Sequence, residues 1–167
     1  MSILKKSIIA SAALALPLAV SANSKLERMM KDPIQWVQQS GDYAGHRYSS
    51  LDQINKSNVG SLKVAWTFST GVLRGHEGGP LVIGDTMYVH TAIPNIVYAL
   101  DLNDNQRIIW KYNPVKGGKY PGGETMDRVI SVMCCDNVNR GVNYHPNGTI
   151  VLHAADTSVI ALDAKTC

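Results

Sequence analysis

Two adjacent cysteines, Cys134 and Cys135, are the residues of this sequence most able to form an unusual chemical feature. Neighbouring Cα atoms lie about 3.8 Å apart across a trans peptide, below the roughly 4.4–6.8 Å of ordinary disulfides, so a bond between them strains the backbone. Such strain occurs mainly at functional sites, and the bonded pair would offer a rigid, polarisable surface to a planar ligand. The cysteine count favours this vicinal bond, while pairing with Cys167 and two free thiols remain open alternatives.

Two charged residues accompany the cysteine pair. Arg140 follows it by five residues, and a guanidinium fork suits the recognition of carboxylates. Glu77, in the Gly-His-Glu-Gly run of residues 75–78, lies just before the first of two similar stretches of sequence, and Arg140 lies just before the second. A lone arginine or glutamate is more often a solvated surface residue. Their matching places before a repeat make both of them candidates for one shared binding site.

Other common chemistries lack their signatures. The five histidines (46, 76, 90, 145 and 153) show no metal-ligand spacing, and there is no glycine-rich phosphate loop or serine nucleophile elbow. We therefore assign no metal ligand and no catalytic residue to this chain. The formal net charge is only +3, which argues against a nucleic-acid binder.

A repeat follows each of the two charged residues. Residues 79–101 align without gaps on residues 141–163, at an offset of 62 (141 − 79). The alignment places Gly79 on Gly141, Val89 on Val151, Ala92 on Ala154, Val97 on Val159, and the Ala-Leu-Asp run ending at Asp101 on the one ending at Asp163. Each copy reads as turn, strand, turn, strand, and such a unit buries both faces of its sheet only by stacking on neighbours.

The residue pattern predicts mainly strands. We expect a short helix over residues 25–31, a polar, turn-rich excursion over 32–61, and strands over 62–68, 86–91, 96–100, 107–112, 149–153 and 158–162. In the first of these strands Val64, Trp66 and Phe68 should share a face. An Asp in a tight turn with Trp110 one strand later suits four-stranded sheets packed face to face, as in a β-propeller.

These elements predict an all-β chain. A hydrophobic share of 45% and a charged share of 17% exclude disorder as the dominant state. Two blades cannot close a propeller, which needs at least about four. We therefore expect an incomplete propeller in which residues 62–167 form the first blades and residues 23–61 form an N-terminal segment.

Residues 1–22 read as a cleaved secretory signal peptide. Lys5 and Lys6 precede an apolar run of thirteen residues, 8–20, and small residues end the segment at Ala22. The alternative is a membrane anchor, but a span needs about 20 residues. We expect a mature protein without a membrane span, exported to the periplasm, where disulfides persist.

Several motifs together resemble one known family. They are Arg47-Tyr48-Ser49, residues 65–71, Gly75-His76-Glu77-Gly78, Cys134-Cys135-Asp136, Val138-Asn139-Arg140-Gly141 and Ala161-Leu162-Asp163. From about Trp36 to Thr166 the sequence resembles the pyrroloquinoline-quinone (PQQ) dependent alcohol dehydrogenases, particularly large subunits of lanthanide-dependent methanol dehydrogenases. The sequence departs from the family at Cys167, where glycine is usual, and in residues 115–129, which form a longer stretch than usual.

The resemblance implies an eight-bladed β-propeller that holds PQQ at its centre. It implies a vicinal disulfide between Cys134 and Cys135 stacked on the quinone, with Glu77 and Arg140 as polar contacts to the cofactor. It further implies a lanthanide or calcium ion whose ligands, like the catalytic Asp, would lie beyond Cys167, so that this chain alone is expected to be inactive.

As partners, the resemblance implies a small primary alcohol, a c-type cytochrome that accepts the electrons, and a second copy of the full-length chain in a homodimer. The alternative from another class is a non-catalytic propeller of the cell envelope that shares only the repeat.

Overall fold

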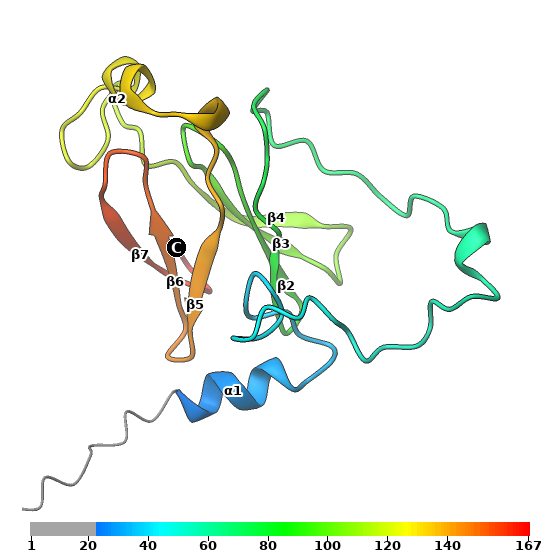
Figure 1. Cartoon of the computed structure of the whole chain (residues 1–167). Coiled ribbons are helices and arrows are strands. Elements are labelled where there is room, and N and C mark those ends of the chain that lie inside the picture. The colour runs from blue at the N-terminus through cyan, green and yellow to red at the C-terminus, as the bar shows by residue number, and fades with distance from the viewer. Residues whose placement is uncertain (1–22) are drawn as a thin grey trace, which may run out of the picture.

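The computed structural model describes residues 23–167, which form two antiparallel sheets (Figure 1). The first sheet has four strands in chain order, β1 (Leu81–Ile83), β2 (Thr86–His90), β3 (Val97–Asp101) and β4 (Arg107–Tyr112). The second sheet has three strands, β5 (Val142–His145), β6 (Thr149–His153) and β7 (Val159–Asp163). The expected bounds of β4 and β6 are confirmed, whereas the short β1 and β5 were not predicted.

In the described part of the chain, two short α-helices and two 3₁₀ turns lie outside the sheets. They are α1 (Ser24–Met30), α2 (Met126–Val132), η1 (Val59–Ser61) and η2 (Cys135–Asn137). Each α-helix begins at a side-chain cap, because Asn23 accepts a hydrogen bond from Leu26 N and Thr125 accepts one from Arg128 N. No helix within residues 23–167 is long and apolar enough to cross a membrane. Residues 1–22, where we expect the signal peptide, lie outside the described part of the chain.

The main core lies between the two sheets, which pack face to face. It consists of Leu81, Tyr88, Val97, Ala99 and Trp110 from the first sheet and Val142, Ile150, Leu152, Leu162 and Ala164 from the second sheet and the turn after it. All ten of these residues are buried. Burial of this apolar surface is the main force that holds neighbouring blades together. The predicted β-propeller blade packing is therefore present, with Trp110 in the interface between the sheets.

The two sheets are related as the repeat predicts, but with one local shift. Thr86 pairs with Asp101 in the first sheet and Thr149 pairs with Asp163 in the second. The strands β2 and β6 are thus offset by 63 residues (149 − 86), while β3 and β7 keep the offset of 62. The turn from β5 to β6 has one more residue than the turn from β1 to β2, and the next loop has one fewer. The gapless matches of Val89 with Val151 and Ala92 with Ala154 were therefore wrong.

Equivalent residues of the two sheets differ sharply in exposure. Val97 is fully buried against the second sheet, whereas its equivalent Val159 is 66% exposed. Ala99 is likewise buried and Ala161 exposed. The outer face of the second sheet thus presents the same apolar pattern that the first sheet uses to bind its neighbour.

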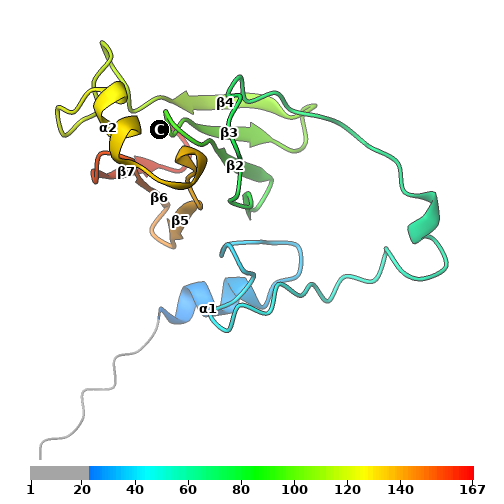
Figure 2. The same ribbon diagram turned by 45° about the horizontal axis from the view of Figure 1, so that its top comes forward.

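The predicted strand over residues 62–68 is absent. These residues belong to a long excursion, roughly residues 47–75, that leaves the sheets and returns to them (Figures 1 and 2). A strand needs a hydrogen-bonded neighbouring strand, and residues 62–68 have none among residues 23–167. No sheet covers their side chains either, and Val64 is 81% exposed. Only at Phe68 does the segment rejoin the first sheet, where the ring packs edge-on against Tyr98. Alternation of residue types predicted the strand, but tertiary pairing decides whether one forms.

The N-terminal segment is attached to the first sheet at one point. Trp36 and Val82 exchange two backbone hydrogen bonds, each 2.9 Å long, so that the chain at Trp36 runs antiparallel beside β1. This pairing places the residues after Trp36 at the edge of the first sheet, next to the connection that leads into β1.

Candidate functional site

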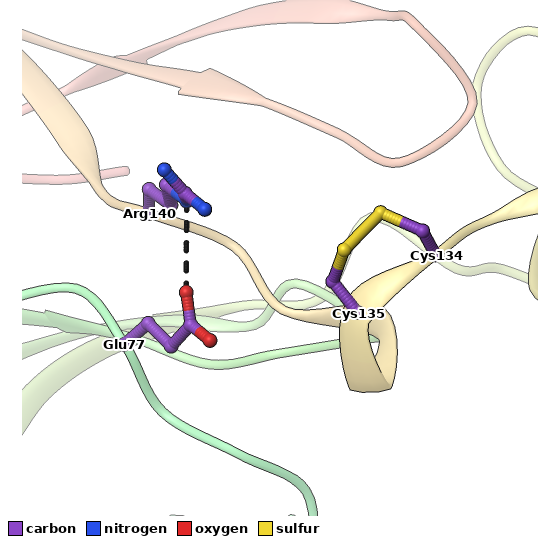
Figure 3. The surroundings of a disulfide bond; sticks show 4 residues. All are labelled: Glu77, Cys134, Cys135 and Arg140. Carbon is purple, nitrogen blue, oxygen red and sulfur yellow. Dashed lines mark ion pairs between the residues drawn. A yellow bond between two sulfur atoms is a disulfide. The ribbon is translucent and has the colours of Figure 1, made fainter.

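The structure brings Glu77 and Arg140 together, although 63 residues separate them (140 − 77). Arg140 Nε lies 3.6 Å from Glu77 Oε2, and the two side chains face each other across the gap between the blades (Figure 3). Glu77 lies in the connection before β1 and Arg140 in the connection before β5. Because repeated blades bring equivalent connections to the same end of the structure, the two charges meet there.

Neither charge is buried. The Arg140 side chain is 82% exposed and that of Glu77 is 49% exposed. Their separation exceeds a normal N–H···O hydrogen bond of 2.7–3.2 Å, so the ion pair is loose and solvent-screened. The guanidinium therefore keeps donors that can bind an anionic or carbonyl ligand.

The vicinal disulfide is present between Cys134 and Cys135, with both residues exposed (Figure 3). Cys167 is a free cysteine, so the alternative pairings are excluded. The Cα atoms of the bonded pair are 3.8 Å apart, the spacing of a trans peptide. Cys135 has a φ of 66°, in the left-handed region that non-glycine residues seldom adopt. The two cysteines thus lie on a tight, strained turn at the start of η2.

The disulfide turn is held in place by backbone hydrogen bonds. Asn137 N donates to Cys134 O at 3.2 Å, which closes the turn. Asn137 O in turn accepts a hydrogen bond at 3.1 Å from Ile93 N, in the loop between β2 and β3. On the other side, Met133 caps the C-terminus of α2, and its N–H donates to Val129 O. The connection that carries both the disulfide and Arg140 is therefore anchored to the preceding blade.

A cleft of about 410 Å³ opens beside the ion pair. It is lined by Trp36, Gln39, Arg47, Glu77, Gly78, Gly79 and Arg140. Sequence reasoning missed Trp36, Gln39 and Arg47 as cleft residues. Arg47 carried a usable signal, because it belongs to Arg47-Tyr48-Ser49, one of the motifs on which the family resemblance rests. Gln39 carried none, because only the pairing of Trp36 with Val82 brings it beside Arg140.

Gln39 connects the N-terminal segment to the second sheet. Its Nε2 donates to Val142 O at 3.2 Å, beside Gly141. A Cβ atom at Gly141 would overlap the Gln39 amide, so glycine makes room for this contact.

The side chains that line the cleft combine a planar aromatic ring, an amide, two guanidinium groups and one carboxylate. This donor set suits a planar, negatively charged molecule better than a cation. Among residues 23–167 no group of three or more His, Cys, Asp or Glu side chains is placed to hold a metal ion.

Comparison with known proteins identifies relatives across most of the chain. The family model for PQQ, the glucose/ethanol/alcohol dehydrogenase β-propeller domain, matches residues 36–167. The chain is similar to a lanthanide-dependent methanol dehydrogenase of Methylorubrum extorquens, with 56% identity over 87% of this chain and 22% of the relative. It is also similar to methanol dehydrogenase [cytochrome c] subunit 1 of Paracoccus denitrificans, with 44% identity over 87% of this chain and 22% of the relative.

A solved structure agrees with these relatives. A europium-containing methanol dehydrogenase matches with a TM-score of 0.77 and 52% identity, over 86% of this chain and 23% of that chain. This chain therefore spans less than a quarter of the length of each of these three relatives.

Proposed function

The chain belongs to the PQQ β-propeller family of glucose, ethanol and alcohol dehydrogenases, and from this premise we propose that it is part of an exported quinoprotein that oxidises methanol or a similar small primary alcohol to an aldehyde. The single observation that carries the proposal is the vicinal disulfide on the same connection as Arg140, which faces Glu77 across the blade interface. A scaffold without a cofactor has no use for a disulfide on a strained turn in the same connection as a loosely paired arginine.

The residues present fit PQQ, which is a planar quinone carrying carboxylates. The exposed disulfide offers a rigid face to a flat ring system, and the Arg140 fork suits a carboxylate or a carbonyl oxygen. The cleft volume of about 410 Å³ lies within the roughly 300–1,000 Å³ of small-molecule sites. Glu77 and Arg140 line this cleft, whereas the disulfide lies outside its lining but on the same connection as Arg140. On these grounds we assign Cys134, Cys135, Glu77 and Arg140 to cofactor binding.

Each of these residues has a distinct role in the proposal. When bound, PQQ supplies the two-electron acceptor chemistry that alcohol oxidation requires. The disulfide excludes water from the ring face that it covers and restricts the ring to one plane. Arg140 binds the anionic edge, and Glu77 limits where the guanidinium can point. The turn that carries the disulfide is anchored by backbone hydrogen bonds before the ligand binds, which reduces the entropic cost of binding.

The proposal extends to groups outside the described residues. We infer a lanthanide or calcium ion, with ligands and a catalytic base elsewhere in the gene product, since one relative is named lanthanide-dependent and a structural neighbour contains europium. We infer a c-type cytochrome as electron acceptor, because another relative is named for cytochrome c. We also propose a homodimer of full-length chains and a periplasmic location after cleavage of residues 1–22.

We propose three segments for the chain. They are the signal peptide (1–22), an N-terminal segment (23–61) and the propeller blades (62–167). Residues 32–61 hold no strand and only the 3₁₀ turn η1, which supports a separate second segment, while the regular strands of the third segment begin at β1.

The test uses the full-length gene product with PQQ and either a lanthanide or calcium. We expect dye-linked methanol oxidation and a bound-quinone absorption band. Arg140→Gln should weaken PQQ binding by roughly 10- to 100-fold, the loss of a hydrogen bond to a charged group. Arg128→Gln is the matched control, because Arg128, on α2, is also exposed and also paired, with Glu124 just before the helix. A folded product that binds no quinone with either metal would contradict the proposal and favour a non-catalytic propeller.

A further inference from the structure

His90 is buried beside the backbone segments that carry Glu77 and Arg140. It is the last residue of β2 and only 4% exposed. Its Nε2 atom lies 3.0 Å from the carbonyl oxygen of Asn139, the residue before Arg140. The sequence offered no metal or catalytic role for this histidine, and the site described above does not use it.

The imidazole also contacts the other half of the site. A Cβ atom at Gly78 would fall on the His90 ring and within 2.8 Å of the Arg140 backbone carbon. Gly78 is the residue after Glu77. His90 therefore touches the backbone next to each of the two charged residues, and glycine at position 78 is what allows this close approach.

Asn139 is fixed from the opposite side as well. Its Nδ2 donates to His153 O at 2.9 Å, and its Oδ1 accepts from Gly141 N at 3.0 Å. The side chain of Asn139 is thus bound within the second sheet, while its carbonyl is bound by His90 of the first. Asn139 and His90 therefore connect the two blades by hydrogen bonds immediately before Arg140.

The charge state of His90 follows from these contacts. A carbonyl oxygen only accepts, so Nε2 must carry the proton. Nδ1 is buried without a hydrogen-bond partner among the described residues, and burial lowers the pKa of the imidazole. His90 is therefore a neutral donor, which adds no positive charge beneath Arg140.

We propose that His90 is a positioning residue for the cofactor contacts. Its neutral imidazole holds the backbones of Gly78 and Asn139 at a fixed distance from each other, and this distance sets the separation of Glu77 and Arg140. This role of His90 rests on the proposed function, because it concerns how Glu77 and Arg140 are arranged before PQQ binds. Each charged side chain is flexible, so its aim depends on how firmly the adjacent backbone is held.

The test measures PQQ affinity of the full-length apoprotein by titration, independently of turnover. In His90→Met the ring volume is filled but the donor is lost, and we expect the Kd to rise roughly 10-fold, the upper range for one hydrogen bond. His90→Gln, whose amide can still donate to Asn139 O, should stay within about 3-fold of wild type. His153→Met is the matched control, because His153 ends β6 as His90 ends β2, yet its side chain is exposed.

A second comparison separates positioning from general stability. If His90 acts through Arg140, then His90→Met should add little to the loss of affinity in the Arg140→Gln background. Equal losses in both backgrounds, or unchanged affinity of a folded His90→Met protein, would overturn the proposal. If His90→Met does not fold, Gly78→Ala disturbs the same contact from the loop and should raise the Kd similarly. A wild-type product that binds no PQQ would overturn the proposed function and this inference together, whereas a PQQ-binding wild type with an insensitive His90 would overturn the inference alone.

Discussion

The indole N–H of Trp110 in the first sheet donates to the carbonyl of Ala164, just after the second sheet, over 3.0 Å. The hydroxyl of Tyr88 donates to the same oxygen at 2.9 Å. Asp163 shapes the turn that presents this carbonyl, since its Oδ1 accepts hydrogen bonds from Lys165 N and Thr166 N. The blades are thus joined by apolar packing and by two buried hydrogen bonds to one acceptor.

Removing the Tyr88 hydroxyl should weaken this junction. In Tyr88→Phe the carbonyl keeps Trp110 as a donor, so no group is left unpaired, and we expect the free energy of unfolding to fall by about 1 kcal/mol. Denaturant unfolding of the full-length gene product measures the change. Tyr144→Phe is the control, because Tyr144 packs on the same core but makes no hydrogen bond through its hydroxyl to residues 23–167. A loss in the control as large as that in Tyr88→Phe would contradict the assignment to the hydrogen bond.

The equivalence of Val97 and Val159 predicts where a further blade packs. Val97→Ala should destabilise the protein by about 2 kcal/mol, because it leaves a cavity in the core between the sheets. Val159 is 66% exposed here, yet in the full-length gene product we expect Val159→Ala to cause a loss of similar size. The control is Ile34→Ala, at a position 71% exposed and outside the sheets. If Val159→Ala were as neutral as this control, no blade would cover that face.

The buried His90 should make stability depend on pH. Burial lowers its pKa below the ordinary 6.5, so at mildly acidic pH the unfolded state binds the proton and the native state does not. The contribution of neutral, buried His90 to the free energy of unfolding is therefore fully present above about pH 6.5 and is lost as the pH falls below that value. The melting temperature of wild type should therefore drop more between pH 7 and 5 than that of His90→Gln. The exposed-site variant His153→Gln should retain the wild-type slope, and equal slopes for all three proteins would refute this prediction.

Gly141 should tolerate no side chain. Its φ of 142° is unfavourable for L-residues, and an added Cβ would meet the Gln39 amide. We expect Gly141→Ala to destabilise the protein by about 1–3 kcal/mol, as strained backbone conformations do. Adding Gln39→Ala should restore part of this loss by removing the overlap but not the backbone strain. Gly60→Ala is the control, because nothing lies within 4 Å of its added Cβ. Full restoration by Gln39→Ala would show that strain plays no part.

Much of the fold was predictable from local patterns. Alternating apolar residues between turn residues located β4 and β6, because a half-buried strand imposes a period of two on its residues. Cysteine counting favoured the vicinal bond, which the structure contains. The sequence left open whether Trp110 faces outward or lies between the sheets, and the structure buries it between them.

The amino-acid sequence by itself therefore located five of the seven described strands and the approximate blade repeat, because these depend on residue types at short spacing. The side chains proposed to contact a cofactor stay a prediction. Only the tertiary structure decided that residues 62–68 lack a partner strand, that the repeat shifts by one residue between two turns, and that Gln39 and His90 lie beside Arg140. Each of these depends on which distant segment supplies a hydrogen-bonding neighbour or fills the space over a glycine. Such long-range contacts leave no periodic trace in the chain, since they are fixed by packing between blades rather than within one.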